Sequence, residues 1–107
     1  MAKGEALGEF EQLVMLAVLR LGGDAYGMRV RQEITERTAR EVAIGAVYAT
    51  LERMEAKGLI RSRVGDATPE RGGRAKRWFE VTGTGMEALK RSRQEVASMA
   101  EGLVFPL

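Results

Sequence analysis

The stretch that decides the fold runs from Ala43 to Thr82 and reads AIGAVYATLERMEAKGLIRSRVGDATPERGGRAKRWFEVT. Its first part has the apolar spacing of a helix over about residues 43–57, and Gly58 follows as a helix stop. Residues 59–64 and 75–82 read as strands, and the Gly- and Pro-containing segment between them is a loop. The stretch therefore predicts a helix followed by a β-hairpin with a long tip.

The positive charge of the chain is concentrated on this hairpin. The net charge is only +2, which on its own says little about partners. Between residues 61 and 77, however, six bases accompany two acids, so this segment carries +4 and the remainder sums to −2. A helix followed by an arginine-rich hairpin suits contact with a polyanion at two places.

Composition argues against several classes of protein. A chain of 107 residues suits one domain. It contains neither cysteine nor histidine, so disulfides, thiolate or imidazole metal sites and the commonest acid–base catalyst are missing. No apolar run is long enough to span a membrane, and the first residues lack a signal-peptide pattern. We expect a cytoplasmic protein that is not an enzyme, holds no metal or cofactor, and does not enter a membrane.

Three further helices accompany the helix and hairpin. The first is predicted over residues 9–21, and the second over residues 25–38 with Asp24 as its N-cap. The last begins at Thr82 or Thr84, where residues 84–87 fit a capping box. The fold class is mainly α with a small β-hairpin. We divide the chain into a tail (1–8), a helix and hairpin domain (9–82), a C-terminal helix (83–104) and a second tail (105–107).

Two helices are rich in apolar surface. The centre of the first, residues 13–19, is apolar around most of its circumference, so it is either a central core helix or lies between the core and a second subunit. The last helix repeats apolar residues at a near-heptad spacing. We expect these helices to pair two copies of the chain through Phe10, Leu13, Val14, Ala17, Leu89, Val96, Met99 and Leu103.

Several short motifs follow one another in a definite order. They are Tyr26-Gly27, the run Ile44-Gly45-Ala46-Val47-Tyr48-Ala49-Thr50-Leu51, Arg53, Met54, Lys57-Gly58-Leu59, the run Arg71-Gly72-Gly73-Arg74-Ala75-Lys76-Arg77-Trp78-Phe79, Val81-Thr82 and Gly85. In this combination, over roughly residues 10–89, the chain resembles the short branch of the PadR family of bacterial transcriptional regulators. The resemblance implies a homodimeric winged helix-turn-helix, usually a repressor on a pseudo-palindromic operator, with the first and last helices at the dimer interface.

The chain departs from the family pattern at a few places. Ala39 stands where a helix-ending Gly is common in the family, and Ala43 where a capping Ser is common. Some short members bind flat drugs between aromatic side chains at the dimer centre. The last helix of this chain has no aromatic residue before Phe105, so a pocket of that kind is not indicated.

The predicted DNA contacts lie on the helix over residues 43–57 and on the hairpin, the wing. They are Ile44, Gly45, Ala46, Tyr48, Ala49 and Arg53 on the helix, and Arg71, Gly72, Gly73, Arg74 and Lys76 on the wing. Arg61, Arg63 and Arg77 rank below these because nearby acids can pair with them, and Trp78 is expected to pack within the wing. Tyr26 either contacts the DNA backbone through its hydroxyl or covers the edge of the core.

The main hypothesis is therefore a sequence-specific, DNA-binding transcriptional regulator that acts as a homodimeric repressor. The predicted helix face has small side chains and few direct readers of bases, so specificity would lean on DNA shape. One alternative is a winged-helix module that binds protein and not DNA. Another is a ligand-sensing repressor with a pocket at the dimer interface; the sequence is compatible with a small-molecule inducer but does not indicate one.

Overall fold

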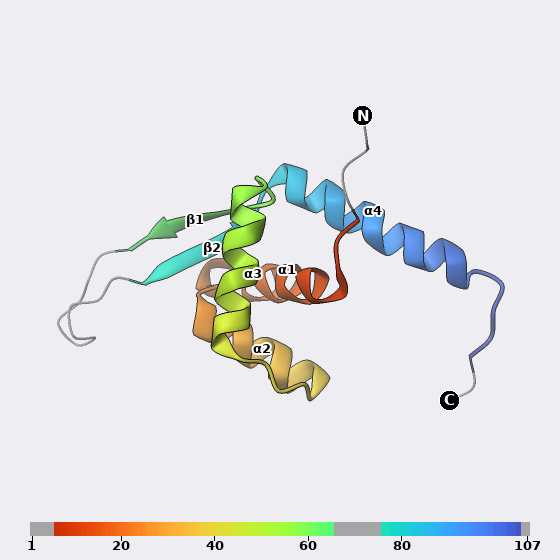
Figure 1. The fold of residues 1–107 in the computed structure, drawn as a ribbon, viewed down its shortest axis with the longest axis horizontal. Coiled ribbons are helices and arrows are strands. Elements are labelled where there is room, and N and C mark those ends of the chain that lie inside the picture. The colour runs from red at the N-terminus through yellow and green to blue at the C-terminus, as the bar shows by residue number, and fades with distance from the viewer. Residues whose placement is uncertain (1–5, 66–75, 106–107) are drawn as a thin grey trace.

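The computed structural model describes residues 6–65 and 76–105 of the chain. Its elements are α1 (Glu9–Leu21), the 3-10 turn η1 (Gly22–Asp24), α2 (Gly27–Thr38), α3 (Ile44–Ala56), β1 (Ile60–Val64), β2 (Arg77–Val81) and α4 (Gly83–Ala100). Figure 1 shows that α1, α2 and α3 pack together, and that the hairpin and α4 leave this bundle on opposite sides. Within the described ranges, no helix combines the length and hydropathy that a membrane span requires.

The core lies where α1 meets α2 and α3. Met15 of α1 is completely buried, as are Leu51 and Met54 of α3, and these large side chains supply most of the apolar contact that holds the bundle. α1 buries more than one face, which makes it the central helix of the domain. Leu13 and Leu16 are only partly covered, so α1 keeps an apolar strip at the surface.

The second helix begins two residues later than predicted, and Asp24 is not its N-cap. Asp24 lies in η1, and its carboxylate pairs with Arg29 at 3.3 Å. The backbone of Ala25 and Tyr26 is drawn to the hairpin instead: the Phe79 N–H donates to the Ala25 carbonyl at 2.8 Å, and Tyr26 forms an isolated antiparallel bridge with Trp78. Because this pairing keeps Tyr26 extended, α2 starts only at Gly27.

The last helix is capped by Thr82, and the predicted capping box at residues 84–87 is not used. The Thr82 hydroxyl accepts a hydrogen bond from the Gly85 N–H at 3.0 Å and donates one to the Gly58 carbonyl at 2.7 Å. A Cβ added at Gly85 would overlap the Leu59 carbonyl oxygen and crowd Val81. Only glycine therefore lets the first turn of α4 lie so close to the end of α3 and the base of the hairpin.

The far half of α4 projects from the domain. The predicted helix to residue 104 ends at Ala100, and Gly102 follows in a left-handed conformation with φ of +83°. Val96 and Met99 keep 63% and 81% of their surfaces exposed, and Leu103, beyond the helix end, keeps 62%. These apolar side chains are not part of the domain's own core.

We predict that Ala39→Gly stabilises the protein. Ala39 ends α2 in a left-handed conformation with φ of +61°, which costs a residue with a Cβ about 1–2 kcal/mol. Glycine also raises the conformational entropy of the unfolded chain, which offsets part of that gain. The net increase in unfolding free energy is therefore about 0.5–1 kcal/mol, which urea or thermal denaturation can measure. The matched control is Ala97→Gly at an exposed position inside α4, which should lose about the same amount. A loss at both positions would contradict the left-handed turn.

Candidate nucleic-acid interface

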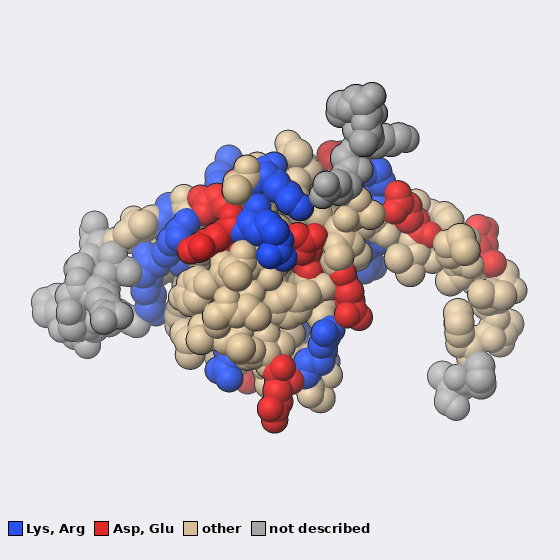
Figure 2. Space-filling view, viewed as in Figure 1, with Lys and Arg blue, Asp and Glu red and all other residues tan. Residues whose placement is uncertain are grey.

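The outward face of α3 is small and uncharged over its N-terminal half. α3 turns Val47, Leu51 and Met54 into the core, which leaves Gly45, Ala46, Tyr48 and Ala49 at the surface. In Figure 2, where α3 faces the viewer, this region is tan, and charged side chains gather at the C-terminal end of the helix and near the hairpin. A face without long side chains can approach the floor of a groove closely. Ile44, also predicted on this face, is half-buried and packs against the core.

The N-terminus of α3 carries backbone N–H groups without a side-chain cap. Its N-cap is Ala43, which has no acceptor in its side chain, and the first N–H groups of a helix have no partner within the helix. Next to this end, Arg31 of α2 donates from Nε to the Val42 carbonyl at 2.7 Å. The guanidinium and the positive end of the helix dipole thus lie close together, an arrangement that favours an anionic group.

Tyr48 and Gly27 fit together as one unit. A Cβ added at Gly27 would overlap the phenol ring of Tyr48, so the ring lies directly on the backbone of the first turn of α2. Gly27 is buried, while Tyr48 keeps 37% of its surface exposed. The glycine therefore fixes the direction of an aromatic side chain that stands on the exposed face of α3.

A row of alternating aromatic and basic side chains continues from Gly27 to the hairpin. The Lys76 ammonium lies 3.7 Å from the centroid of the Tyr26 ring, and the Tyr26 and Trp78 rings meet edge to face with centroids 6.4 Å apart. Arg63, which faces Trp78 across the two strands, lies 4.8 Å from the Trp78 ring. Such contacts hold a cation over the face of an aromatic ring, and Arg63 is exposed while Lys76 is partly exposed. We call Tyr26, Arg63, Lys76 and Trp78 the wing base.

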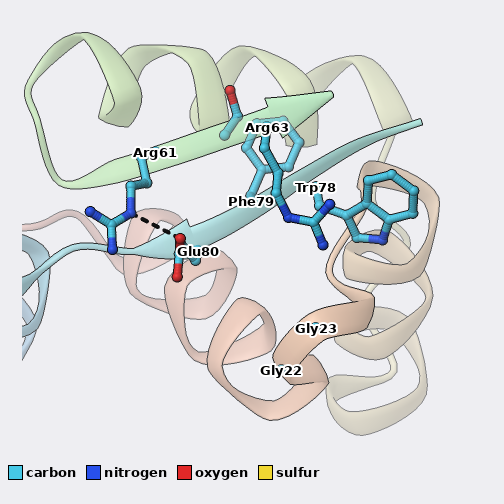
Figure 3. Close-up of a pocket in the computed structure, with 8 residues that line it drawn as sticks. Gly22, Gly23, Arg61, Arg63, Trp78, Phe79 and Glu80 are labelled. Atoms are coloured by element: carbon cyan, nitrogen blue, oxygen red, sulfur yellow. Dashed lines mark hydrogen bonds and ion pairs between the residues drawn. The ribbon is translucent and has the colours of Figure 1, made fainter. Parts of the chain in front are cut away.

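One face of the hairpin forms a shallow pocket of about 150 Å³ beside η1. Figure 3 shows Arg61 and Glu80 joined as an ion pair there, with Arg63 lying over Trp78 closer to η1. The Arg61 Nε and Glu80 Oε1 are 2.9 Å apart, and both side chains are mostly exposed. An exposed pair of this kind adds little stability, but it neutralises Arg61. Arg63 therefore carries the more available charge on this face.

The opposite face of the hairpin is tied to α3 by Arg77. Its guanidinium donates to Glu55 at 2.6 Å and to the Ser62 hydroxyl at 3.1 Å, and it lies 3.8 Å from Glu52. These contacts connect β2 to the C-terminal half of α3. Arg77 thus connects the hairpin to the helix. The prediction that nearby acids pair with the arginines of the two strands is confirmed for Arg61 and Arg77. It is wrong for Arg63, which among the described residues lies over Trp78 instead.

Arg53 is held by the first helix. Its Nε lies 3.2 Å from Glu11 Oε2, although half of its side chain remains exposed. Burial acts to raise the pKa of the Glu11 carboxyl, but hydrogen bonds from the Gly8 N–H and from Arg53, with the charge of Lys57, outweigh it and lower that pKa below its ordinary value. Glu11 is therefore a firmly ionised anchor, and Arg53 connects α3 to α1.

The remaining predicted site residues are those of the wing tip and those of the predicted dimer interface. Arg71, Gly72, Gly73 and Arg74 of the wing lie outside the described residues. Of the residues predicted for subunit pairing, Val14, Ala17 and Leu89 are buried within the chain's own core, Phe10 and Leu13 are partly buried against it, and Val96, Met99 and Leu103 are exposed.

Sequence reasoning missed two features of the interface. Arg63 was ranked below the tip residues, and Arg31 was not among the candidates. The pairing of Arg63 with Trp78 depends on strand register, which the long connection between the strands does not determine. Arg31 lies about two turns before the end of α2. Its contact with the Val42 carbonyl depends on how the α2–α3 connection folds back along α2, which no local sequence signal indicates.

Comparison with known proteins identifies the relatives of this chain. The model of the transcriptional regulator PadR-like family matches residues 15–91. The chain is 29% identical over 96 residues to an uncharacterised protein of Lysinibacillus sphaericus, covering 88% of this chain and 84% of that protein.

Solved structures show the same fold at lower identity. A PadR family transcription regulator from Clostridium difficile is 23% identical with a TM-score of 0.68, covering 86% of this chain and 92% of that one. A PadR-like transcriptional regulator from Bacillus cereus is 19% identical with a TM-score of 0.69, covering 92% and 93%. The winged-helix DNA-binding protein F93 from STIV is 18% identical with a TM-score of 0.64, covering 90% and 97%. The fold is a winged helix-turn-helix.

We predict that Gly27 and Tyr48 are strongly coupled. Gly27→Ala should lower the unfolding free energy by about 1–3 kcal/mol, because the added methyl group forces the Tyr48 ring away. In Tyr48→Ala the ring is gone, so adding Gly27→Ala should cost little. A double-mutant cycle by urea denaturation measures the difference, which should exceed about 0.5 kcal/mol. Additive losses would show that the two residues are not in contact.

Proposed function

The chain belongs to the PadR-like family of transcriptional regulators, and on that premise we propose that it binds DNA sequence-specifically as a homodimeric repressor. Its operator would be pseudo-palindromic, since a twofold dimer presents the same surface to two half-sites. Because a regulator of this kind would act on the chromosome, we expect the protein in the cytoplasm.

The observation that carries this proposal is a continuous surface from α3 to the wing base. Tyr48 on α3 rests on Gly27, the neighbouring Tyr26 holds Lys76, and Trp78 beyond it holds Arg63. A small uncharged helix face is thus joined, through the first turn of α2, to two cations that are at least partly exposed. That combination suits a groove floor flanked by two phosphate backbones.

We assign the groove to α3 and the flanking backbone to the wing. α3 would enter the major groove N-terminus first, with Gly45, Ala46 and Ala49 close to the base edges. The uncapped N–H groups of its first turn and the Arg31 guanidinium would meet a phosphate. Since small side chains offer thymine methyl contacts but few hydrogen bonds to bases, sequence preference would depend largely on DNA shape.

The wing supplies most of the electrostatic attraction in this arrangement. Lys76 and Arg63 lie over aromatic rings and stay at least partly exposed. Arg71 and Arg74, outside the described residues, add two more cations to the segment between the strands. Affinity should therefore fall steeply with salt. If the chain were instead a protein-interaction module, it would bind no duplex even at low salt.

We predict that Arg63→Ala and Lys76→Ala each reduce the slope of log K against log salt by about one unit and weaken binding to all duplexes alike. The measurement is a fluorescence anisotropy titration with duplex DNA over a range of salt concentrations. Arg61→Ala is the matched control: it removes the same charge from the same strand, but Arg61 is already paired with Glu80. Equal slopes for wild type and for the Arg63 and Lys76 variants would refute the wing assignment.

The dimer would use the apolar surface that the domain leaves uncovered. Val96, Met99 and Leu103 are exposed at the end of the chain, and α1 keeps an apolar strip at Leu13 and Leu16. That strip opens, between α1 and α2, into a mainly apolar groove of about 220 Å³. Contiguous apolar surface of this kind marks an interaction site, and pairing α4 with α1 of a second copy would cover both.

We predict that Met99→Glu weakens dimerisation on the order of 100-fold, because a twofold interface loses the buried methionine twice and gains two buried charges. Analytical ultracentrifugation over a range of protein concentrations measures the change. Arg93→Glu, at an exposed position of the same helix, is the control and should leave dimerisation nearly unchanged. A Met99→Glu variant as dimeric as the wild type would exclude α4 from the interface.

A further inference from the structure

Ser92 is the outermost point at which α4 is held by its own domain. The first turns of α4 bury Gly85, Ala88 and Leu89, and Ser92 is the last buried residue of the helix, with 3% of its surface exposed. From there α4 continues to Ala100 without another buried residue. The direction of its free end is therefore determined by two supports: the close packing at Gly85 and whatever holds Ser92.

What holds Ser92 is the backbone that precedes the first helix. The Leu7 N–H donates to the Ser92 hydroxyl at 2.9 Å, in a buried contact between residues 85 positions apart. Leu7 is itself buried, and its carbonyl accepts from the Gln12 side chain at 3.1 Å. In Figure 1 this segment passes beside α4 just before α1 begins.

The same segment is also connected to α3, the proposed recognition helix. The Gly8 N–H donates to Glu11 Oε1 at 2.9 Å, and Glu11 Oε2 pairs with Arg53 of α3 at 3.2 Å and lies 3.9 Å from Lys57 Nζ. A continuous series of polar contacts thus runs from α4, through residues 7–11, to α3. α4 also packs against β2. The series of polar contacts is therefore a second connection between α4 and the rest of the domain.

We propose that Ser92 is a positioning residue, which fixes the direction of α4 relative to α3 through residues 7–11 and so sets the spacing between the two half-sites that the dimer binds. The inference rests on the proposed function, because it takes α4 as the pairing helix and α3 as the recognition helix. The part of α4 beyond Ser92 amplifies a small tilt. The eight residues from Ser92 to Ala100 span about 12 Å, so a tilt of about 10° moves the end of the helix by about 2 Å.

A change of that size matters because of the symmetry of the dimer. Each subunit contributes the same tilt, so the separation and rotation of the two α3 helices both change. Half-site spacing follows directly from that geometry. Losing the Ser92 hydroxyl would leave the Leu7 N–H buried without a partner, which costs free energy. That cost is relieved if the segment before α1 and the helix α4 move apart.

The test is a selection of binding sites by the full-length protein. Wild type, Ser92→Ala and the control Ser98→Ala are each used to enrich a randomised duplex library long enough for two half-sites one helical turn apart. Ser98 lies on the same helix and is exposed, and its hydroxyl accepts from the Gln94 side chain of that helix. Glu11→Ala, which interrupts the same series at the α3 end, is a second variant in case Ser92→Ala folds poorly. Hydrogen exchange at the Leu7 amide reports the contact without DNA.

We expect wild type and Ser98→Ala to enrich one half-site sequence at one spacing. Ser92→Ala and Glu11→Ala should enrich the same half-site at several spacings, and Ser92→Ala should expose the Leu7 amide to exchange. If both variants keep the single spacing of the wild type, the inference is overturned while the proposed function stands. If both lose affinity equally at every spacing, the contact is only structural and the inference is again overturned. If the wild type enriches no sequence, the proposed function fails and the inference fails with it.

Discussion

The arrangement of the whole surface depends on the backbone of two residues, Ala25 and the extended Tyr26. By pairing with β2 they attach the hairpin to the helices, through the Phe79 N–H at 2.8 Å from the Ala25 carbonyl and the bridge between Tyr26 and Trp78. An isolated two-stranded hairpin has marginal stability. With this isolated bridge on one side, and with Arg77 bound to Glu55 on the other, the hairpin becomes part of the domain. The wing base can then stand at a defined distance from α3.

The same pairing explains why the two halves of the candidate interface differ so much in chemistry. In the proposed arrangement α3 approaches a groove through its small face, because its charged residues are engaged elsewhere. Arg53 pairs with Glu11 of α1, and Glu52 and Glu55 lie against Arg77 of β2. The charge that would attract a polyanion is then supplied by the hairpin, where Lys76 and Arg63 lie over aromatic rings. Tyr26 and Gly27 join these halves, because the Tyr26 ring contacts Lys76 of the wing base and the Tyr48 ring lies against Gly27.

Local signals predicted much of this fold and little of its contacts. The bounds of α1 agree with the predicted residues 9–21, and α3 and both strands lie within the predicted ranges, because apolar spacing and Gly58 act over a few residues. The N-cap of α2 was wrong because Asp24 is a good cap by local rules, whereas pairing with β2 is a contact distant in sequence. The roles of Gly27 and Gly85 also depend on partners from other elements, Tyr48 and the Leu59 carbonyl. Whether the predicted tip residues Arg71 to Arg74 contact DNA remains a prediction.

The exposed end of α4 affects how the amount of active dimer depends on the amount of the protein in the cell. The core closes around α1 without any help from Val96 or Met99, so one chain has a complete domain before it meets another. Pairing through α4, as proposed, then adds to stability by mass action rather than being a condition of folding. At low abundance, the concentration of the active dimer would rise with the square of the concentration of free chain. A modest change in the rate of synthesis or degradation would thus change occupancy of an operator more than proportionally.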